Sequence, residues 1–345
     1  MRIASYHSNS DIRIEELPTP QVGPGESLVK IHASGICGSD IMEWYRRDKV
    51  PLVLGHEIAG EIAAVGPGVS NIQVGDRVVA SHHVPCLECR YCRRGYETVC
   101  QTLHTTTFDP GGFSQYVRMP QINTRLGVFP IPDNVTYEEA SFAEPLACVL
   151  RGQNRANVGV GDTVAVIGSG ISGILHIALA RARGAECIVA ADINEARLPW
   201  AEKFGADITT NDSFSISGLL LDNIGRKADI VILTTGHPKA VQAGFDAADE
   251  GATILLFAPS DPGTTVQINI TDLFFKHDRT VTTTYANSPA DLQQALVLLS
   301  EKKVAVKEMI THRITLDEIQ YGFDLVQHGT ESLKVVVEPN RSPHS

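Results

Sequence analysis

Four cysteines lie close together in the first third of the chain, in an order that suits a metal ion. Two gaps of two residues are followed by one gap of seven, in the series Cys86, Cys89, Cys92 and Cys100. Thiolates at this spacing can surround one ion tetrahedrally, and Zn²⁺ suits soft sulfur ligands in that geometry. Four thiolates leave no open position for a substrate, so the motif predicts a structural zinc site. The alternative is a zinc finger that contacts a partner molecule.

A second pattern, rich in glycine, could hold a dinucleotide. The apolar stretch Thr163–Ile167 runs into Gly168, Gly170 and Gly173 in the order Gly-x-Gly-x-x-Gly, and a helical pattern begins at Ile171. The first glycine permits a tight turn, the second lets the backbone approach a pyrophosphate, and the third lets helix pack on strand. The helix start, Ile171 included, offers N–H groups to an anion. The alternative is a glycine-rich turn that binds nothing.

An acidic residue strengthens the dinucleotide hypothesis. Asp192 follows a second apolar stretch, about twenty residues beyond the glycines, where a carboxylate would bind the adenosine ribose. A carboxylate there disfavours a 2′-phosphate, so the sequence predicts NAD rather than NADP as the cofactor. Arg197 lies one turn further on and could reach the adenosine end. As alternatives, Asp192 would be an ordinary helix cap and Arg197 part of a solvated helix face.

Composition narrows the possible partners and the compartment. The net charge is -11, which makes a nucleic-acid backbone an unsuitable main partner. The first residues carry no apolar export segment, and no apolar run reaches membrane-spanning length. Seven cysteines in such a chain favour metal binding over disulfides. We therefore expect a cytoplasmic protein that acts on a small molecule, with neither nucleic acid nor membrane as partner.

The order of elements predicts an α/β protein with two kinds of sheet. Up to about residue 130, short β patterns such as Ser27–Ala33, Glu57–Val65 and Asp76–Ala80 alternate with Gly and Pro, which indicates a compact, partly antiparallel β domain. From Asp162 onward, apolar strands alternate with helices, which predicts a parallel sheet covered on both faces. Its strands are predicted at Thr163–Ile167, Cys187–Ala191, Asp229–Leu233, Thr253–Phe257 and Thr280–Tyr285, with a weaker one near Asp207–Thr209, and helices at Ile171–Arg183 and Glu195–Phe204.

Other segments complete the prediction. Thr136 and Glu139 form a possible capping box at a helix start. The tail from about Ser288 contains two helical stretches and a last strand, Leu333–Val337. We expect this tail to return to the first domain.

Two further segments are weak alone but informative in combination. They are Gly-Ile-Cys-Gly-Ser-Asp, which contains Cys37, and Gly-His-Glu, which contains His56. With the four cysteines and the glycine motif, in this order, they make the chain resemble the zinc-dependent medium-chain alcohol dehydrogenases, in particular the polyol branch of sorbitol and threonine dehydrogenases. The resemblance covers nearly the whole chain. It implies a GroES-like β-rich catalytic domain over 1–152, with the zinc lobe at about 84–102, a Rossmann doubly wound NAD-binding domain over 153–287, and a return to the catalytic domain over 288–345.

The resemblance also implies a second, catalytic zinc. Its ligands would be Cys37 and His56 together with Glu144 of a Glu-Pro-Leu motif, or with Glu57, and the sequence does not decide between the two glutamates. Asp40 resembles the carboxylate that orients the zinc histidine. Zinc with an open position would lower the pKa of a substrate hydroxyl before hydride leaves for the nicotinamide. Ser39 matches the hydroxyl that takes the substrate proton.

The chain departs from the family at the proton relay. Met42 stands where a histidine often carries the proton to solvent, and a thioether cannot do so. His32, His82 and His83 are candidates to replace it.

Substrate contacts in this family come from positions that correspond here to Glu43, Phe108 and Tyr285. Thr284 replaces the arginine that precedes this tyrosine in the polyol branch, which weakens sorbitol itself as the substrate. The resemblance predicts NAD-dependent oxidation of a secondary hydroxyl in a polyol, cyclitol or amino alcohol, by a homodimer or homotetramer. The alternatives are a primary-alcohol dehydrogenase or aldehyde reductase of the same family and, less favoured, a non-catalytic zinc and nucleotide-binding protein.

Overall fold

The computed structural model describes residues 1–341 and divides them into two compact units. The first unit contains Met1–Ala147 together with the residues from Asn287 on, and the second contains Cys148–Ala286. The first boundary falls inside helix α5 (Ala143–Ala156), as does the limit at residue 152 that the sequence suggests. None of the helices in residues 1–341 is long and apolar enough to cross a membrane.

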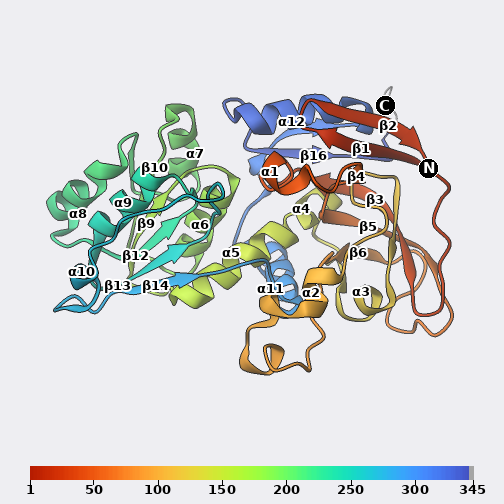
Figure 1. Cartoon of the computed structure of the whole chain (residues 1–345), viewed down its shortest axis with the longest axis horizontal. Coiled ribbons are helices and arrows are strands. Elements are labelled where there is room, and N and C mark those ends of the chain that lie inside the picture. Colours follow the sequence, from red (N-terminus) through yellow and green to blue (C-terminus); the bar gives the residue numbers. More distant parts are fainter. Residues whose placement is uncertain (342–345) are drawn as a thin grey trace. The chain divides into compact units, whose positions relative to one another are not determined.

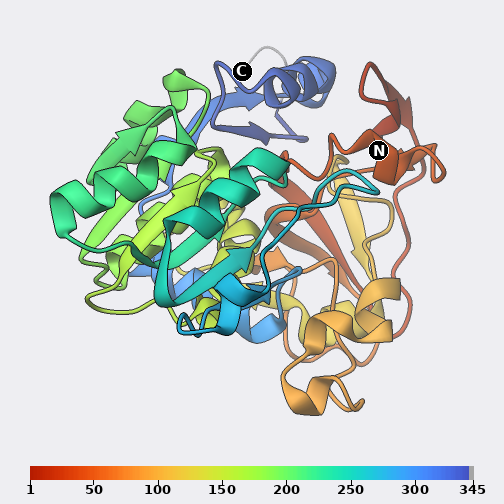
Figure 2. The same ribbon diagram turned by 60° about the vertical axis from the view of Figure 1, so that its left-hand side comes forward.

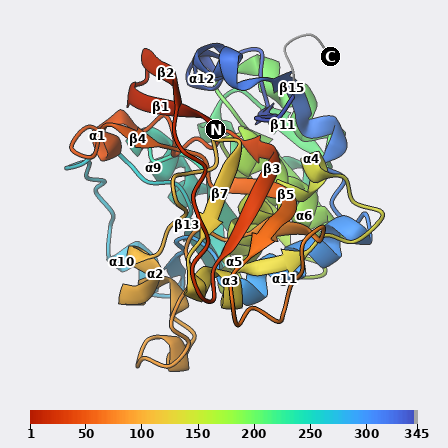
Figure 3. The same ribbon diagram turned by 90° about the vertical axis from the view of Figure 1, so that its right-hand side faces the viewer.

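A seven-stranded sheet forms the centre of the first unit. Its order is β15-β16-β3-β5-β6-β8, and β7 pairs with the first half of β3 on the edge opposite β5 (Figure 3). The strands are β3 (Ser27–Gly35), β5 (Glu57–Val65), β6 (Arg77–Ala80), β7 (Tyr116–Met119), β8 (Val128–Pro130), β15 (Ile310–Ile314) and β16 (Lys334–Val337). Strand β16 runs antiparallel to β3, with Val336 opposite Gly35. The end of the chain thus completes the sheet that its beginning starts.

Apolar side chains on these strands explain why the sheet forms. Val29 and Ile31 of β3, Ile58 and Ile62 of β5 and Val78 of β6 belong to one buried cluster. Burial of such side chains is the main favourable contribution to folding. A smaller sheet, β2 (Asp11–Glu16), β1 (Arg2–Ser8) and β4 (Leu52–Val53), lies in the same unit.

Six helices belong to the first unit, among the described residues. They are α1 (Glu43–Arg46), α2 (Gln101–Thr105), α3 (Gln121–Leu126), α4 (Tyr137–Ala140), α11 (Pro289–Ser300) and α12 (Ile319–His328). The predicted capping box at the start of α4 is confirmed, since the Thr136 hydroxyl and the Glu139 carboxylate each accept a backbone N–H of the other residue.

The second unit is a parallel six-stranded sheet with helices on both faces (Figures 1 and 2). Its order is β11-β10-β9-β12-β13-β14, made of β9 (Thr163–Ile167), β10 (Cys187–Ala191), β11 (Ile208–Thr210), β12 (Ala228–Leu233), β13 (Ala248–Leu256) and β14 (Thr280–Thr283). Every residue of β9 and β10 is buried, as expected for strands covered on both sides. The helices are α6 (Ile171–Ala182), α7 (Leu198–Lys203), α8 (Ile216–Ile224), α9 (Pro238–Ala247) and α10 (Thr271–Phe274), with the second half of α5.

The elements differ from the sequence predictions in several places. Strand β13 begins at Ala248 rather than Thr253, and strands β1, β2, β4, β7 and β8 had no predicted range. The helix predicted at Glu195–Phe204 begins as a 3₁₀ turn, and α7 starts only at Leu198, with a proline in its first turn. Strand β14 ends at Thr283, so Tyr285 lies beyond the sheet. Strand β15 was not predicted, because three consecutive polar residues separate its two isoleucines in the sequence Ile-Thr-His-Arg-Ile.

Candidate functional site

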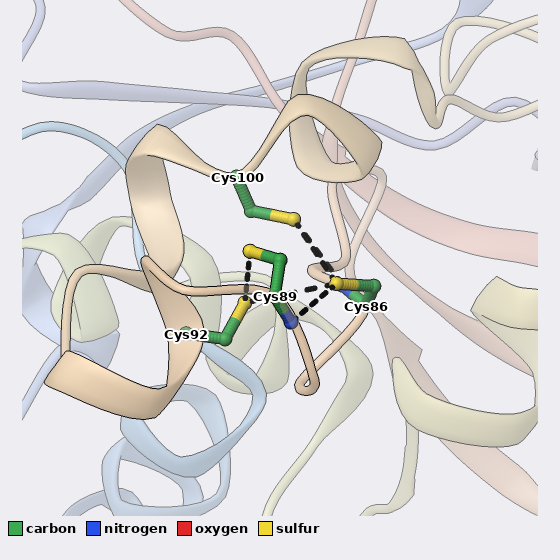
Figure 4. A group of neighbouring side chains, drawn as sticks. All are labelled: Cys86, Cys89, Cys92 and Cys100. Carbon is green, nitrogen blue, oxygen red and sulfur yellow. Dashed lines mark hydrogen bonds between the residues drawn. The ribbon is translucent and has the colours of Figure 1, made fainter.

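The four cysteine sulfurs converge in a loop that projects from the first unit (Figures 1 and 4). All four sulfurs lie within 4.8 Å of one another. The Sγ atoms of Cys89 and Cys92 are 3.6 Å apart, as are those of Cys86 and Cys100. Local turns create this arrangement, because the N–H of Cys89 donates to Cys86 Sγ at 3.3 Å and that of Cys86 donates to Cys100 Sγ at 3.4 Å.

The thiols of this loop differ in acidity in a way that suits a cation. Burial works against ionisation of Cys100, but backbone N–H groups outweigh it and lower its pKa to about 6. Burial and the neighbouring thiols raise the pKa of Cys92 to about 12. Four thiolates this close repel one another, so a divalent cation is needed to hold them all ionised. The donor set and the convergence of the sulfurs fit a structural zinc ion.

A second cluster joins Cys37, His56 and Glu57. Their candidate ligand atoms lie within 4.8 Å of one another, and these two clusters are the metal-type groupings present in residues 1–341. Pairing of β3 with β5 explains the meeting, since Gly35 lies opposite Glu57 at the end of the ladder. Cys37 follows β3 by two residues and His56 directly precedes β5, so both side chains are brought to the same corner. Thiolate, imidazole and carboxylate are ligands that zinc accepts.

Asp40 lies behind this cluster and is fully buried. Its Oδ1 is 3.5 Å from His56 Nδ1, and its Oδ2 accepts the backbone N–H of Cys37 at 3.0 Å. Burial alone would raise the pKa of Asp40, but the charge of the neighbouring His56 and the N–H of Cys37 hold it below its ordinary value. Burial opposes protonation of His56, yet Asp40 and Cys37 raise its pKa well above the usual one. The negative field at the imidazole therefore favours a cation, whether proton or metal.

Two glutamates were predicted as alternative ligands, and they occupy different surroundings. Glu57 belongs to the cluster and is 1% exposed. Glu144 lies at the start of α5, and its Oε1 accepts a hydrogen bond from Asn287 Nδ2 at 2.9 Å. Glu144 does not belong to the described cluster of Cys37, His56 and Glu57, whose ligand atoms lie within 4.8 Å of one another. The geometry favours Glu57 as the third protein ligand.

The candidate replacements for the missing relay histidine differ in position. Ladder pairing sets Ala80 opposite Ile58, and His82 accordingly comes beside His56, with ring centroids 4.9 Å apart. Burial lowers the pKa of His82 well below its ordinary value. His83 Nδ1 instead bonds the carbonyl of Thr106 at 2.6 Å, and His32 stacks on Tyr137. Only His82 of the three has its ring against that of a candidate ligand.

The residues predicted to touch substrate differ in burial and in their contacts. Glu43 opens α1, and its Oε1 lies 3.5 Å from the backbone N of Asn9. Phe108 is 2% exposed within the β3–β5–β6 core, with its ring centroid 5.9 Å from that of His82. Tyr285 is 51% exposed in the second unit. Ser39 directs its backbone N–H to Cys37 Sγ at 3.4 Å.

The glycine motif of the second unit has the predicted strand–turn–helix form. Gly168 has a φ of 100°, which favours glycine, and a Cβ at Gly173 would lie 1.9 Å from the carbonyl oxygen of Gly168. Helix α6 begins at Ile171. Asp192, 8% exposed, accepts the N–H of Ser169 in this turn at 2.7 Å, and Arg197 Nη1 lies 3.4 Å from the same carboxylate. The carboxylate also accepts the N–H of Asn194 at 2.8 Å, but the cap of the following 3₁₀ turn is Asn194 and not Asp192.

One residue near the second cluster was missed from the sequence. Lys334 of β16 is 1% exposed and donates to Glu57 Oε2 and, at 3.0 Å, to the carbonyl of Ile36. The sequence does carry a signal for this residue, since Lys334 is a single lysine inside the apolar run Leu333–Val337. A lysine buried in such a strand requires a charged or polar partner.

Comparisons with known proteins agree with this description. Residues 23–133 match the family model described as alcohol dehydrogenase GroES-like domain, and residues 172–301 match that of zinc-binding dehydrogenase. Sorbitol dehydrogenase of Bacillus subtilis (strain 168) is 33% identical over 99% of this chain and 98% of its own length. L-threonine 3-dehydrogenase of Aeromonas hydrophila is 31% identical over 97% and 98%.

Solved structures show the same fold. A protein of E. coli CFT073 described as a short chain alcohol dehydrogenase complexed with cofactor NADH has a TM-score of 0.88 and 27% identity, over 98% of this chain and 99% of its own. A putative zinc-binding dehydrogenase of Sinorhizobium meliloti 1021 bound to NADP has a TM-score of 0.85 and 27% identity, over the same shares. The two cofactors differ, so the fold alone does not select between them.

Proposed function

Because the chain belongs to the zinc-dependent medium-chain alcohol dehydrogenases, polyol branch, we propose that it oxidises a secondary hydroxyl of a polyol, cyclitol or amino alcohol to a ketone with NAD. The observation that carries the proposal is the meeting of Cys37, His56 and Glu57 within 4.8 Å. The named activities of the sorbitol and threonine dehydrogenase relatives support a hydroxyl-rich or amine-bearing secondary alcohol. Thr284, in place of an arginine, leaves sorbitol itself less favoured.

The site residues of the first unit have definable parts in this reaction. Cys37, His56 and Glu57 would hold the ion, and Glu144, which Asn287 orients, would lie in its surroundings. A zinc ion bound there supplies Lewis acidity that lowers the pKa of the substrate hydroxyl. Asp40, whose Oδ1 is 3.5 Å from His56 Nδ1, would orient the ring so that Nε2 could bind the ion. Ser39 would accept the hydroxyl proton, and Met42 cannot pass it on.

Cofactor choice is a separate part of the proposal. Asp192 is buried beside the glycine turn, so a 2′-phosphate would meet a negative charge, and like charges in contact cost several kcal/mol. Arg197 offsets part of that repulsion. Replacement Asp192→Ala is expected to raise kcat/KM for NADP relative to NAD by about 100-fold. The NAD proposal fails if the unmodified enzyme already prefers NADP.

A homodimer formed by the second unit is the proposed assembly. Strand β14 ends the parallel sheet, and among the described residues only β13 pairs with it. Nearby apolar side chains are exposed, including Ile270, Phe274, Phe275 and Val281. An uncharged edge strand and such a patch both favour pairing with a second copy. Phe274→Asp should reduce the mass measured by sedimentation, and an unchanged mass would contradict this interface.

The direct test is a substrate screen. The purified enzyme is offered polyols, cyclitols and amino alcohols with NAD or NADP while the absorbance of the reduced cofactor is followed. Turnover of a secondary alcohol with NAD supports the proposal, and preference for primary alcohols would favour the aldehyde-reductase alternative. We also propose that the enzyme works in the cytoplasm, because none of its seven cysteines forms a disulfide in residues 1–341.

A further inference from the structure

Lys334 is a buried cation in the middle of an apolar strand. All four residues of β16 are buried, and Lys334 retains 1% of its exposed surface. An ammonium group in such a place is stable only when paired. Its partners are Glu57 Oε2, the carbonyl of Ile36 at 3.0 Å and the ring of Phe142, whose centroid is 5.9 Å away. The ion pair with Glu57 joins the last strand of the chain to the candidate metal cluster.

The backbone is shaped to admit this pair. Gly35 of β3 lies opposite Glu57 of β5 and opposite Val336 of β16. A Cβ at Gly35 would lie 2.0 Å from Glu57 Oε2 and 2.7 Å from Lys334 Cε. Any larger residue would separate the two charges. Residues of three neighbouring strands, β3, β5 and β16, therefore fix the position of the Glu57 carboxylate.

The pair divides the two oxygens of Glu57. Oε2 is committed to Lys334, and among the described residues Oε1 takes part in no hydrogen bond. A carboxylate can bind a metal ion through one oxygen or both, and a second bound oxygen would fill the position that substrate needs. We propose that Lys334 is a positioning residue that restricts Glu57 to one oxygen at the metal and so keeps the fourth position open. This inference rests on the proposed function, since it assumes a metal at Cys37 and His56.

Charge balance leads to the same role. A divalent ion is neutralised by the thiolate of Cys37 and one carboxylate, so a further unpaired carboxylate charge would weaken its pull on a substrate hydroxyl. Glu57 belongs to the cluster and carries such a charge. The ammonium of Lys334 offsets that charge without occupying the ion itself. Lys334 thus preserves the Lewis acidity of the ion, while Glu57 still helps to bind the ion.

The test follows the metal and not only turnover. In the full-length enzyme, Co²⁺ replaces the ion at Cys37 while the cysteine-rich loop keeps its zinc. The visible spectrum and the rate of Co²⁺ transfer to a chelator are then recorded. Lys334→Met should slow transfer about tenfold, the factor that about 1.4 kcal/mol of added metal–oxygen interaction gives, because both oxygens of Glu57 bind. It should also weaken the visible bands as the coordination number rises. Lys334→Arg should restore both values, and Glu57→Gln should speed transfer about tenfold.

The sign of the change separates the explanations. If the role of Lys334 is purely structural, Lys334→Met should loosen the site and speed the transfer of Co²⁺ to the chelator. That result would overturn the inference. A transfer rate and spectrum equal to those of the unmodified enzyme would overturn it as well. If Lys334→Met does not fold, Lys334→Gln is measured with the same expected and contrary outcomes. A cobalt–thiolate band that is absent, or that persists in Cys37→Ala, removes the metal site and with it the proposed function. If Cys37→Ala abolishes the band but the Lys334 variants leave it unchanged, the inference about Lys334 fails and the proposed function stands.

Discussion

The first unit contains two cysteine-based clusters that are built in opposite ways. The ligands of the four-cysteine loop come from one short segment, and local N–H groups hold its sulfurs. Cys37 and His56 come from different strand ends, and Lys334, the partner of Glu57, lies 277 residues further along the chain. The loop can form wherever its own turns form, whereas the second cluster exists only when β3 and β5 pair, and its lysine partner arrives only when β16 joins them. The chemistry differs accordingly, with a closed set of thiolates in one and a mixed set of three ligands in the other.

The two clusters also balance charge by different means. Backbone N–H groups lower the pKa of Cys100 in the loop. In the second cluster, the side chains of Asp40 and Lys334 set the field at His56 and Glu57. Side-chain partners can be replaced one at a time by substitution, whereas backbone N–H groups cannot. The charge around the second cluster can therefore be changed stepwise, which is not possible in the loop.

The largest expected effect separates the clusters by activity. Cys37→Ala should reduce kcat/KM at least about 1000-fold, since a metal ion supplies several kcal/mol of transition-state stabilisation. The measurement is reduction of NAD with the best alcohol of the screen. Cys148→Ser, a cysteine outside both clusters, is the matched control and should stay within about twofold. Intact hydride transfer in Cys37→Ala would falsify the catalytic assignment.

The reverse experiment alters the loop. Cys100→Ser should remove one zinc per chain and lower the free energy of unfolding by about 2–4 kcal/mol, because metal binding there is part of folding. Turnover per folded molecule should change by less than about threefold. Metal content and denaturant unfolding give the result. A variant that folds normally but loses catalysis would mean that the loop is not merely structural.

A smaller effect is expected from the carboxylate behind His56. Asp40→Asn keeps the shape but removes the charge, and should weaken metal binding or activity about 10- to 100-fold. Competition with a chelator measures the affinity. Asp76→Asn, at a carboxylate that bonds the backbone of Gln73, serves as control. Equal effects from both substitutions would contradict a specific role for Asp40.

The smallest effect concerns a buried histidine without an anionic partner. His176 in α6 packs against Phe257, and burial lowers its pKa to about 3, whereas Asp40 and Cys37 raise that of His56. The unfolded chain binds a proton at His176 below pH 6.5 and the folded chain does not, so stability is lost as pH falls. Between pH 6.5 and 5.5 the loss is about 1 kcal/mol.

His176→Phe, which cannot titrate, should flatten this slope in unfolding curves measured across that interval. His328→Phe, at a histidine near the end of α12, is the matched control. A slope that persists in His176→Phe would show that other groups cause it.

Much of the fold could be predicted because the patterns are local. Strands β9 and β10 have the predicted limits, since continuous apolar runs between Gly-containing turns leave few alternatives. Strand β15 escaped prediction because only its first and last residues are apolar, so the sequence shows no strand pattern there until β16 pairs with it. The early end of β14 likewise depends on tertiary context, with Ala286 at a φ of 50°.

The sequence by itself determined the loop of four cysteines, the glycine turn and the family, because each depends on residue types at short spacing. Only the tertiary structure distinguished Glu57 from Glu144 at the cluster, set His82 beside His56 and brought Lys334 to Glu57. The physical reason is strand register. Pairing across β3, β5, β6 and β16 determines which distant side chains share a corner, and no spacing along the chain encodes that directly.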